Sequence, residues 1–257
     1  GAIGGLSQPG GSLFGIEHQS GGSRSRRQAS GFALPFLKVR ADGSLFGVLR
    51  RNLVVTDTDL VSDKDVTPGE PTLNLRGRDL RYAVLDRSDL HQADLTGANL
   101  DEASLVGSDL RGAWLQCADL NQLLLTDDRE LAVCTSARRA DFSRARLGAA
   151  RMTGIDLAGG RLEEASMEAA ELAYSQLIGA NFASARLDKA DLTGGVQAQG
   201  ANFLIGSLQG ADLTGAQLQF ADFSSAIMQG AVLNLAHLEG AVLRDADLEG
   251  AALQQVR

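Results

Sequence analysis

A leucine at every fifth position constrains this chain more than any other feature of its sequence. The spacing holds without exception through Leu75, Leu80, Leu85, Leu90, Leu95, Leu100, Leu105, Leu110, Leu115, Leu120 and Leu125. A period of five matches neither the 3.6 residues of a helical turn nor the two-residue alternation of a flat strand. Every fifth side chain points inward only if the backbone turns between leucines, so each five-residue unit is predicted to form one face of a coil.

The same period returns twice with a shifted phase. A second block of apolar centres runs from Phe142 to Leu192 and a third from Phe203 to Leu253, and a small residue stands two positions before most centres. The small and the large residue of each unit are predicted to point inward. Successive coils are then expected to stack at about 4.8 Å and to pair their backbone groups. The low aromatic content, 5%, agrees with a narrow interior built from Ala and Leu.

Several of these units carry a recognisable signature. Runs such as Ala93-Asp94-Leu95-Thr96-Gly97 and Ala211-Asp212-Leu213-Thr214-Gly215 resemble the A-(D/N)-L-x-x repeat of the pentapeptide-repeat protein family. The resemblance implies an all-β fold, a right-handed parallel quadrilateral β-helix (β-solenoid) with four pentapeptides per coil and no interior cavity. It implies little about function, because members of the family differ in their partners.

Four units per coil also predict a structural core column. Once one inserted residue near 194–200 is allowed for, four phenylalanine centres fall on a single face: Phe142, Phe182, Phe203 and Phe223. Stacked rings are expected if the insertion bulges outward without removing a face from the coil.

The sequence divides into three parts. Residues 1–31 form a Gly/Ser-rich leader that is expected to be flexible. Residues 32–72, less regular, are expected to cap the solenoid, which is predicted to span residues 73–257 with interruptions at 127–139 and 194–200.

Within the capping segment, Asp42-Gly43 is a candidate hairpin turn between apolar stretches. Val55 and Leu60 share the five-residue phase of Leu75, so an irregular first coil is expected to begin near residue 50.

The interruption at 127–139 is the candidate interaction loop. It lacks the repeat pattern and carries these charged residues: Asp127, Asp128, Arg129, Glu130, Arg138 and Arg139. Loops on rigid scaffolds often carry binding residues, which favours a partner contact. An insertion tolerated because it lies outside the coil explains it equally well, and both explanations stay open.

No group of residues in the sequence predicts catalysis or metal binding. His18, His91 and His237 are far apart, and His237 occupies an outward position. The aspartates before the leucines would need a cleft to raise their pKa, and a solid rod offers none. We therefore predict a protein that is not an enzyme and that holds no cofactor and no metal.

Cys117 falls in an outward turn and Cys134 in the interruption roughly one coil later. Free thiols are favoured, although the two are potential neighbours. Two cysteines do not suggest a disulfide-stapled secreted domain, and no apolar run is long enough to cross a membrane. The expected location is cytoplasmic.

The net charge of −8 belongs to the repeats, since residues 1–72 are nearly neutral. Such a field disfavours direct nucleic-acid binding and favours basic partners, or it simply keeps a long rod soluble. The basic patch of Arg24, Arg26 and Arg27 lacks interleaved aromatic residues and fits a solvated tail better than a phosphate site.

Three functions agree with these features. The first is a non-enzymatic protein-interaction scaffold with an unknown partner. The second follows from the resemblance, because some pentapeptide-repeat proteins mimic duplex DNA and bind type II topoisomerases. The third, a soluble domain of a larger membrane-attached bacterial protein, is suggested by the missing initiator Met and the abrupt end at Val256-Arg257. An uncovered last coil would also permit end-to-end self-association.

Overall fold

The computed structural model describes residues 44–45, 49–50, 53–60, 71–119 and 133–257. β1 (Ser44–Leu45) and β2 (Leu49–Arg50) form an antiparallel pair, with Leu45 opposite Leu49. The candidate hairpin turn at Asp42-Gly43 lies outside the described residues.

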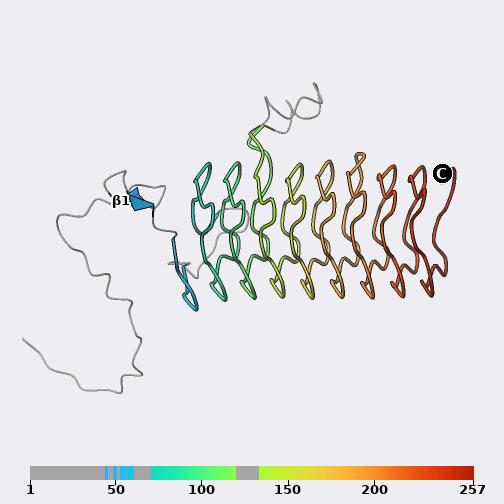
Figure 1. Ribbon diagram of the computed structural model, residues 1–257, viewed down its shortest axis with the longest axis horizontal. Coiled ribbons are helices and arrows are strands. Elements are labelled where there is room, and N and C mark those ends of the chain that lie inside the picture. The colour runs from blue at the N-terminus through green and yellow to red at the C-terminus, as the bar shows by residue number, and fades with distance from the viewer. Residues whose placement is uncertain (1–43, 46–48, 51–52, 61–70, 120–132) are drawn as a thin grey trace, which may run out of the picture. The chain divides into compact units, whose positions relative to one another are not determined.

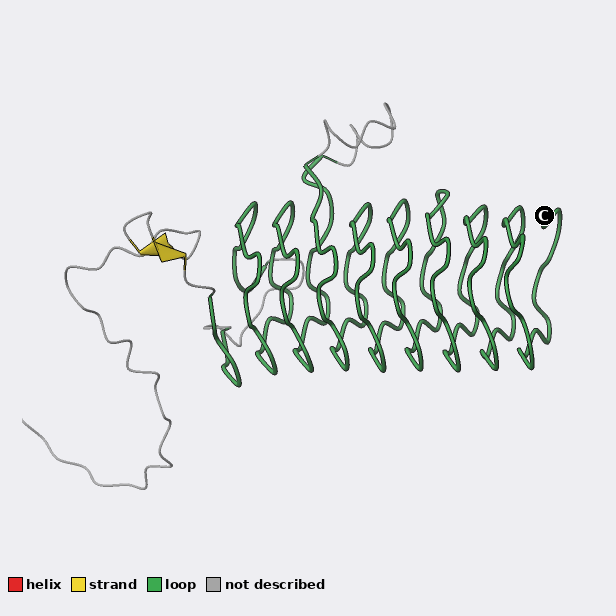
Figure 2. Cartoon of the chain, in the orientation of Figure 1, coloured by secondary structure: helices red, strands yellow, loops and turns green. Residues whose placement is uncertain are grey.

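The other described residues form a stack of four-sided coils (Figures 1 and 2). Each side contributes one residue to a parallel β-bridge with the coil before and the coil after it, as Arg161 does with Asp141 and Asn181. Backbone hydrogen bonds join the same coils, for example Phe142 N–H to Arg161 C=O at 2.7 Å. The architecture is a parallel β-solenoid, in which each side is too short to form an extended strand.

The unit Asp94-Leu95-Thr96-Gly97-Ala98 shows why five residues make one side. Asp94 forms the bridge, and Leu95 is fully buried. Ala98 N–H donates to Leu95 C=O at 2.9 Å and closes a β-turn, with Gly97 at φ +66° as a type II turn requires. Asp94 Oδ1 accepts the Thr96 N–H at 3.0 Å and fixes the entry to that turn. This last bond explains why Asp or Asn so often precedes the buried leucine.

Four ladders of bridged residues define four faces, which the chain visits in the order A, B, C, D. Face A contains Asn74, Asp94, Trp114, Arg151, Glu171, Asp191, Asp212, Val232 and Ala252. Face B contains Asp79, Asn99, Ser136, Asp156, Gln176, Gln197, Gln217 and His237. Face C contains Val54, Val84, Ser104, Asp141, Arg161, Asn181, Asn202, Asp222 and Val242. Face D contains Asp59, Asp89, Asp109, Arg146, Ser166, Arg186, Ser207, Ile227 and Asp247. Faces A and C therefore lie on opposite sides of the coil.

Residues 53–60 belong to a first coil, because Val54 bridges Val84 and Asp59 bridges Asp89. This agrees with the irregular first coil near residue 50 that the five-residue phase of Val55 and Leu60 predicted, before the repeat boundary at 73. Val55 N–H donates to Val84 C=O at 2.7 Å. Residues 1–43, which include the Gly/Ser-rich leader, lie outside the described residues.

The interior of the stack is filled by the inward side chains of each unit. The four phenylalanines Phe142, Phe182, Phe203 and Phe223 are fully buried beneath face C. The ring of Phe203 stacks on that of Phe182 at a centroid distance of 5.0 Å and on that of Phe223 at 4.8 Å. The column is therefore part of the hydrophobic core.

The single inserted residue lies at the corner between faces A and B. Gln176 bridges Gln197, one residue further along the chain than the regular repeat would place the partner. Gly194 and Gly195 both adopt positive φ, +71° and +69°, which lets the corner bulge. The faces on either side keep their bridges, so the phase of the repeat shifts while the coil keeps four sides.

Candidate interaction site

An excursion interrupts the stack between Trp114 and Ser136. Asn99 bridges Ser136, so the chain leaves the coil shortly after Trp114 and rejoins it at Thr135. Thr135 is buried, and its Oγ1 donates to Leu95 C=O at 2.9 Å and accepts the Gly97 N–H at 3.0 Å. The predicted loop at 127–139 therefore extends too far at its C-terminal end, because the chain is already part of the coil at Thr135. Of its charged residues, Asp127, Asp128, Arg129 and Glu130 lie outside the described residues.

Arg138 and Arg139 lie on the coil and not on a loop. Arg138 Nη2 donates to Asp101 Oδ2 at 3.1 Å, and Arg139 Nη2 contacts Glu102 Oε1 at 2.5 Å. Both carboxylates belong to the preceding coil, because the bridge at Ser136 brings the returning chain directly onto it. The spacing of the apolar centres alone did not show where the chain rejoins the stack.

Cys117 and Cys134 form a disulfide at the base of this excursion. The prediction of free thiols, with Cys117 turned outward, is therefore wrong: Cys117 is only 2% exposed. The reason is local, because Ala118 N–H donates to Val133 C=O at 2.8 Å and the returning chain covers the corner. The disulfide therefore links the segment that leaves the coil to the segment that returns to it.

Ion pairs link neighbouring coils through much of the stack. Several arginines contact a carboxylate one coil away: Arg87 with Asp57, Arg144 with Glu164, Arg146 with Asp109, Arg161 with Asp141 and Arg186 with Glu168. Partial burial raises the pKa of Asp101, but hydrogen bonds from Ser136 and Arg138 outweigh it and hold the pKa below its ordinary value. The acidity of this part of the surface is thus largely neutralised.

The last coils have a different charge balance. After Leu187 the sequence has three basic residues, Lys189, Arg244 and Arg257. It has eight acidic residues, Asp188, Asp191, Asp212, Asp222, Glu239, Asp245, Asp247 and Glu249. Most of these carboxylates therefore have no arginine to neutralise them, and this part of the solenoid carries a negative field.

Bulky apolar side chains are exposed on the same coils. Ile205, Phe220 and Leu235 are 59%, 74% and 50% exposed. All three occupy left-handed corners, with φ of +57°, +61° and +62°. A large or β-branched residue rarely adopts this conformation. Each of these residues stands at the turn position that Gly occupies in other units, so a large apolar residue at that position is the signal in the sequence.

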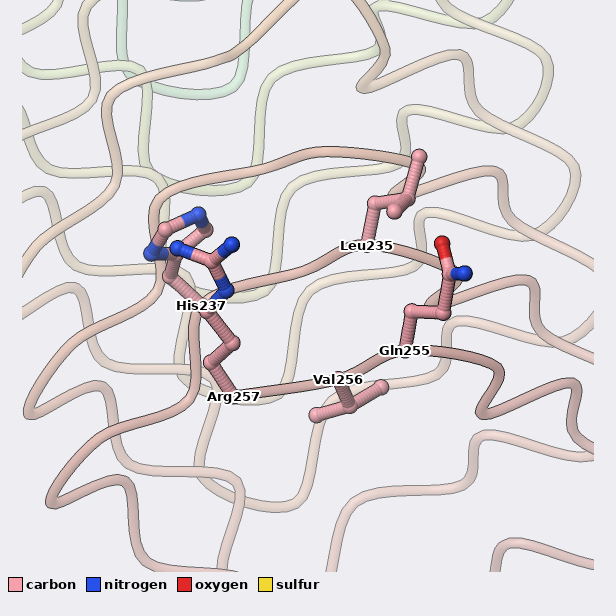
Figure 3. Close-up of a pocket in the computed structure, with 5 residues that line it drawn as sticks. All are labelled: Leu235, His237, Gln255, Val256 and Arg257. Atoms are coloured by element: carbon pink, nitrogen blue, oxygen red, sulfur yellow. The ribbon is translucent and has the colours of Figure 1, made fainter.

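The described histidines lie in separate environments. His91 Nδ1 is 2.6 Å from Asp89 Oδ1, and His237 Nδ1 is 3.6 Å from Glu239 Oε1. Figure 3 shows a shallow hollow at the last coil, in which His237 and Arg257 lie beside Leu235, Gln255 and Val256. Within the described ranges, no three His, Cys, Asp or Glu side chains converge as metal ligands would. Those ranges also contain no helix that is long and apolar enough to span a bilayer.

Comparison with known proteins agrees with this geometry. The family model for pentapeptide repeats matches this chain in eight copies, which together cover about half of it: residues 74–105, 161–196, 194–234 and 228–257. A comparison with curated proteins gave no match.

Solved structures of pentapeptide repeat proteins are also similar. HetL from the cyanobacterium Nostoc sp. strain PCC 7120, involved in heterocyst differentiation regulation, is 26% identical, with a TM-score of 0.42 over 80% of this chain and 87% of HetL. QnrB1, a plasmid-mediated fluoroquinolone resistance protein, is 17% identical, with a TM-score of 0.47 over 80% of this chain and 88% of QnrB1. The right-handed quadrilateral β-helix expected from the sequence is the fold of this family. The repeats, the four-sided coil and the family match together establish that the chain belongs to the pentapeptide repeat family.

Proposed function

We propose that this chain is a non-enzymatic scaffold that binds another protein through the outer surface of its coils. The observation that carries the proposal is the exposure of Ile205, Phe220 and Leu235 at left-handed corners. An L-residue in this conformation costs about 1–2 kcal/mol relative to the right-handed one. Burial does not offset that cost, because each side chain is at least half exposed.

Other corners of the same coils show what structure alone would favour. They carry Gly200, Gly210, Gly215, Gly230 and Gly240, all at positive φ. Glycine adopts this conformation readily. Bulky residues at three such corners are better explained by contact with a partner, which would cover them and supply the missing burial.

The test is a triple variant, Ile205→Gly, Phe220→Gly and Leu235→Gly. Each change places glycine where φ is already positive, so we expect the coil to keep its far-UV circular dichroism spectrum and its thermal midpoint within a few degrees. Affinity capture from the source cells, followed by quantitative mass spectrometry, should show at least a tenfold loss of the proteins retained by the wild type.

A matched control is Ser184→Gly, Lys189→Gly and Ser225→Gly, at corners with the same backbone conformation. It should retain the wild-type set of proteins. If the apolar triple variant captures the same proteins in the same amounts, the exposed corners do not bind and the proposal is overturned.

A DNA-mimicking topoisomerase-binding role is the second candidate, favoured by the unneutralised carboxylates after Leu187. It predicts that saturating protein alters gyrase supercoiling, and an unchanged rate would exclude it. The third candidate, a domain of a larger membrane-attached protein, stays a prediction that the flanking sequence decides.

Two other expectations also stay predictions. One is contact through the excursion, which replacement by a regular pentapeptide pair would test. The other is a cytoplasmic location. The disulfide between Cys117 and Cys134 argues against it, because reducing compartments such as the cytosol keep cysteine thiols in the reduced form.

A further inference from the structure

The exposed apolar residues of the last coils gather around face C. We define the C-face surface as Ile205, Phe220, Asp222, Ile227 and Val242. Ile227 and Val242 are 41% and 43% exposed, and the two corner residues exceed these values. Asp222 lies on face C itself, between the corner occupied by Phe220 and that occupied by Ile205 in the preceding coil.

Hydrogen bonds show that one edge of this surface is continuous. Phe220 N–H donates to Glu239 C=O at 3.0 Å, and Val242 N–H donates to Ala221 C=O at 2.9 Å. The Phe220 ring lies against the next coil, so close to Gly240 that a Cβ there would be 2.7 Å from the ring. Phe220 and Val242 therefore form adjacent apolar groups on neighbouring coils.

The opposite edge is built in the same way. Ile227 N–H donates to Gly206 C=O at 2.9 Å, which brings it beside the residue that follows Ile205. Ile205 N–H donates to Ser224 C=O at 3.0 Å on the same pair of coils. Two apolar edges thus flank the acidic centre at Asp222.

The charges on and around this surface are mainly negative. Asp222 Oδ1 accepts the Ser224 N–H at 2.8 Å, which fixes its carboxylate at the outer side of face C. Hydrogen bonds from Ser224, and to a smaller extent the nearby Arg244 guanidinium, lower the pKa of the Asp222 carboxyl. Arg244 is the one basic residue of that stretch, whereas Asp245 and Asp247 add two carboxylates on the next coil. The whole segment after Leu187 has the acidic excess described above.

We propose that the C-face surface docks a basic amphipathic segment of a partner protein, one that presents Leu-like side chains together with Lys or Arg. The inference rests on the proposed scaffold function and names the chemistry of the partner. The apolar edges would bury the partner's aliphatic groups, and the carboxylates would pair with its cations. Nucleic acids and anionic membranes do not suit this surface, because both carry the same sign of charge.

Fluorescence polarisation with synthetic peptides tests the proposal on the full chain. The probes are a labelled amphipathic Leu/Lys peptide, a Leu/Glu peptide of the same pattern and a Ser/Lys peptide without apolar groups. We expect the Leu/Lys peptide to bind at least tenfold more tightly than either of the others. Raising the salt concentration should weaken this binding, since the carboxylates are exposed.

Two pairs of variants locate the binding. Asp222→Asn, Asp245→Asn and Asp247→Asn together should weaken Leu/Lys binding about tenfold. The same charge change on the opposite face, through Glu171→Gln, Asp191→Asn and Asp212→Asn, should weaken it less than threefold. Likewise Phe220→Gly should weaken binding about tenfold, whereas Tyr82→Gly, at an exposed corner with nearly the same φ far from the C-face surface, should leave it unchanged.

Each contrary result has a distinct meaning. Equal losses from the two charge sets would show non-specific attraction to an acidic rod and overturn the proposal. Preferential binding of the Leu/Glu peptide, or of none of the three, would also overturn it. In these cases the scaffold function still stands if the triple corner variant loses captured proteins, so the two failures are distinguishable.

Discussion

The corner residue is where sequence and backbone conflict most visibly in this protein. Most corners of the described coils place a residue at positive φ, and many of these corners hold Gly, but others hold Glu102, Arg139, Tyr174 or Phe220. In some units an Asp or Asn before the buried centre accepts the N–H two residues on and supports the turn, as Asp94 and Asp222 do. The units of Tyr174 and Phe220 begin with Glu171 and Gln217 and keep the same turn, so the coil tolerates a positive φ at the corner without that support.

Gly194 is a corner where a neighbouring ring requires glycine. A Cβ at Gly194 would lie 2.7 Å from the ring of Tyr174, whereas at Gly215 nothing lies within 4 Å; both have φ of +71°. We expect Gly215→Ala to cost about 1 kcal/mol from the backbone alone and Gly194→Ala to cost about 1–2 kcal/mol more from overpacking. Urea denaturation measures both. In a Tyr174→Gly background the two costs should become equal, and a persistent difference would contradict this explanation.

Asp101 makes the stability of the point where the chain rejoins the stack depend on pH, because its carboxylate accepts hydrogen bonds from Ser136 and Arg138 there. Its pKa in the folded protein is lowered, so its contribution to stability is complete above the ordinary carboxyl pKa of about 3.9 and is lost as pH falls through the lower folded value. Asp101→Asn should lower the free energy of unfolding by about 1 kcal/mol or less at pH 7, because the pair is partly exposed. The difference from wild type should shrink as the pH falls below that lowered pKa and both side chains become neutral. A difference that grows on acidification would show the opposite linkage.

Among the elements of the solenoid, the stacked rings beneath face C offer a test with an internal control. Phe203 stacks on two neighbours, and each stacked pair contributes about 0.5–1.5 kcal/mol beyond burial. Phe142 lies in the same column, between Leu105 and Leu162 rather than between rings. Phe203→Leu should therefore cost about 1–3 kcal/mol more than Phe142→Leu in urea denaturation. Equal costs would show that the rings act only through their volume.

The base of the excursion is the second element with a measurable property. Because Cys117 and Cys134 form a disulfide, iodoacetamide should alkylate neither residue in the unfolded, non-reduced protein and both after reduction. Mass spectrometry of the tryptic peptides gives this result directly. Removing a cross-link over a loop of this length lowers stability by about 3 kcal/mol in the chain-entropy estimate, so Cys117→Ser with Cys134→Ser should unfold at lower urea concentration. Alkylation without reduction would exclude the disulfide.

At the scale of the whole chain, periodicity predicts the repeat and not its interruptions. The five-residue spacing depends on burial within one unit, so Leu95 or Phe203 is recognisable from the sequence alone. Where a chain re-enters the stack depends on contacts with a different coil, such as that of Ser136 with Asn99. The apolar centres therefore indicated the solenoid, whereas the place of Arg138 and the pairing of Cys117 required the structure. The C-face surface was missed for the same reason, because its residues belong to different coils.

The uneven distribution of charge along the stack predicts opposite responses to salt in its two parts. Inter-coil ion pairs such as that between Arg161 and Asp141 stabilise the coils before Leu187, and salt weakens such exposed attractions. The acidic excess after Leu187 produces repulsion, which salt also weakens. Because each coil contacts only its neighbours, the two parts respond separately. Raising NaCl from low to high concentration should therefore speed amide hydrogen exchange in residues 136–166 and slow it in residues 207–237, by about two- to fivefold each. A change of the same sign in both segments would show that a general salt effect outweighs the charge pattern.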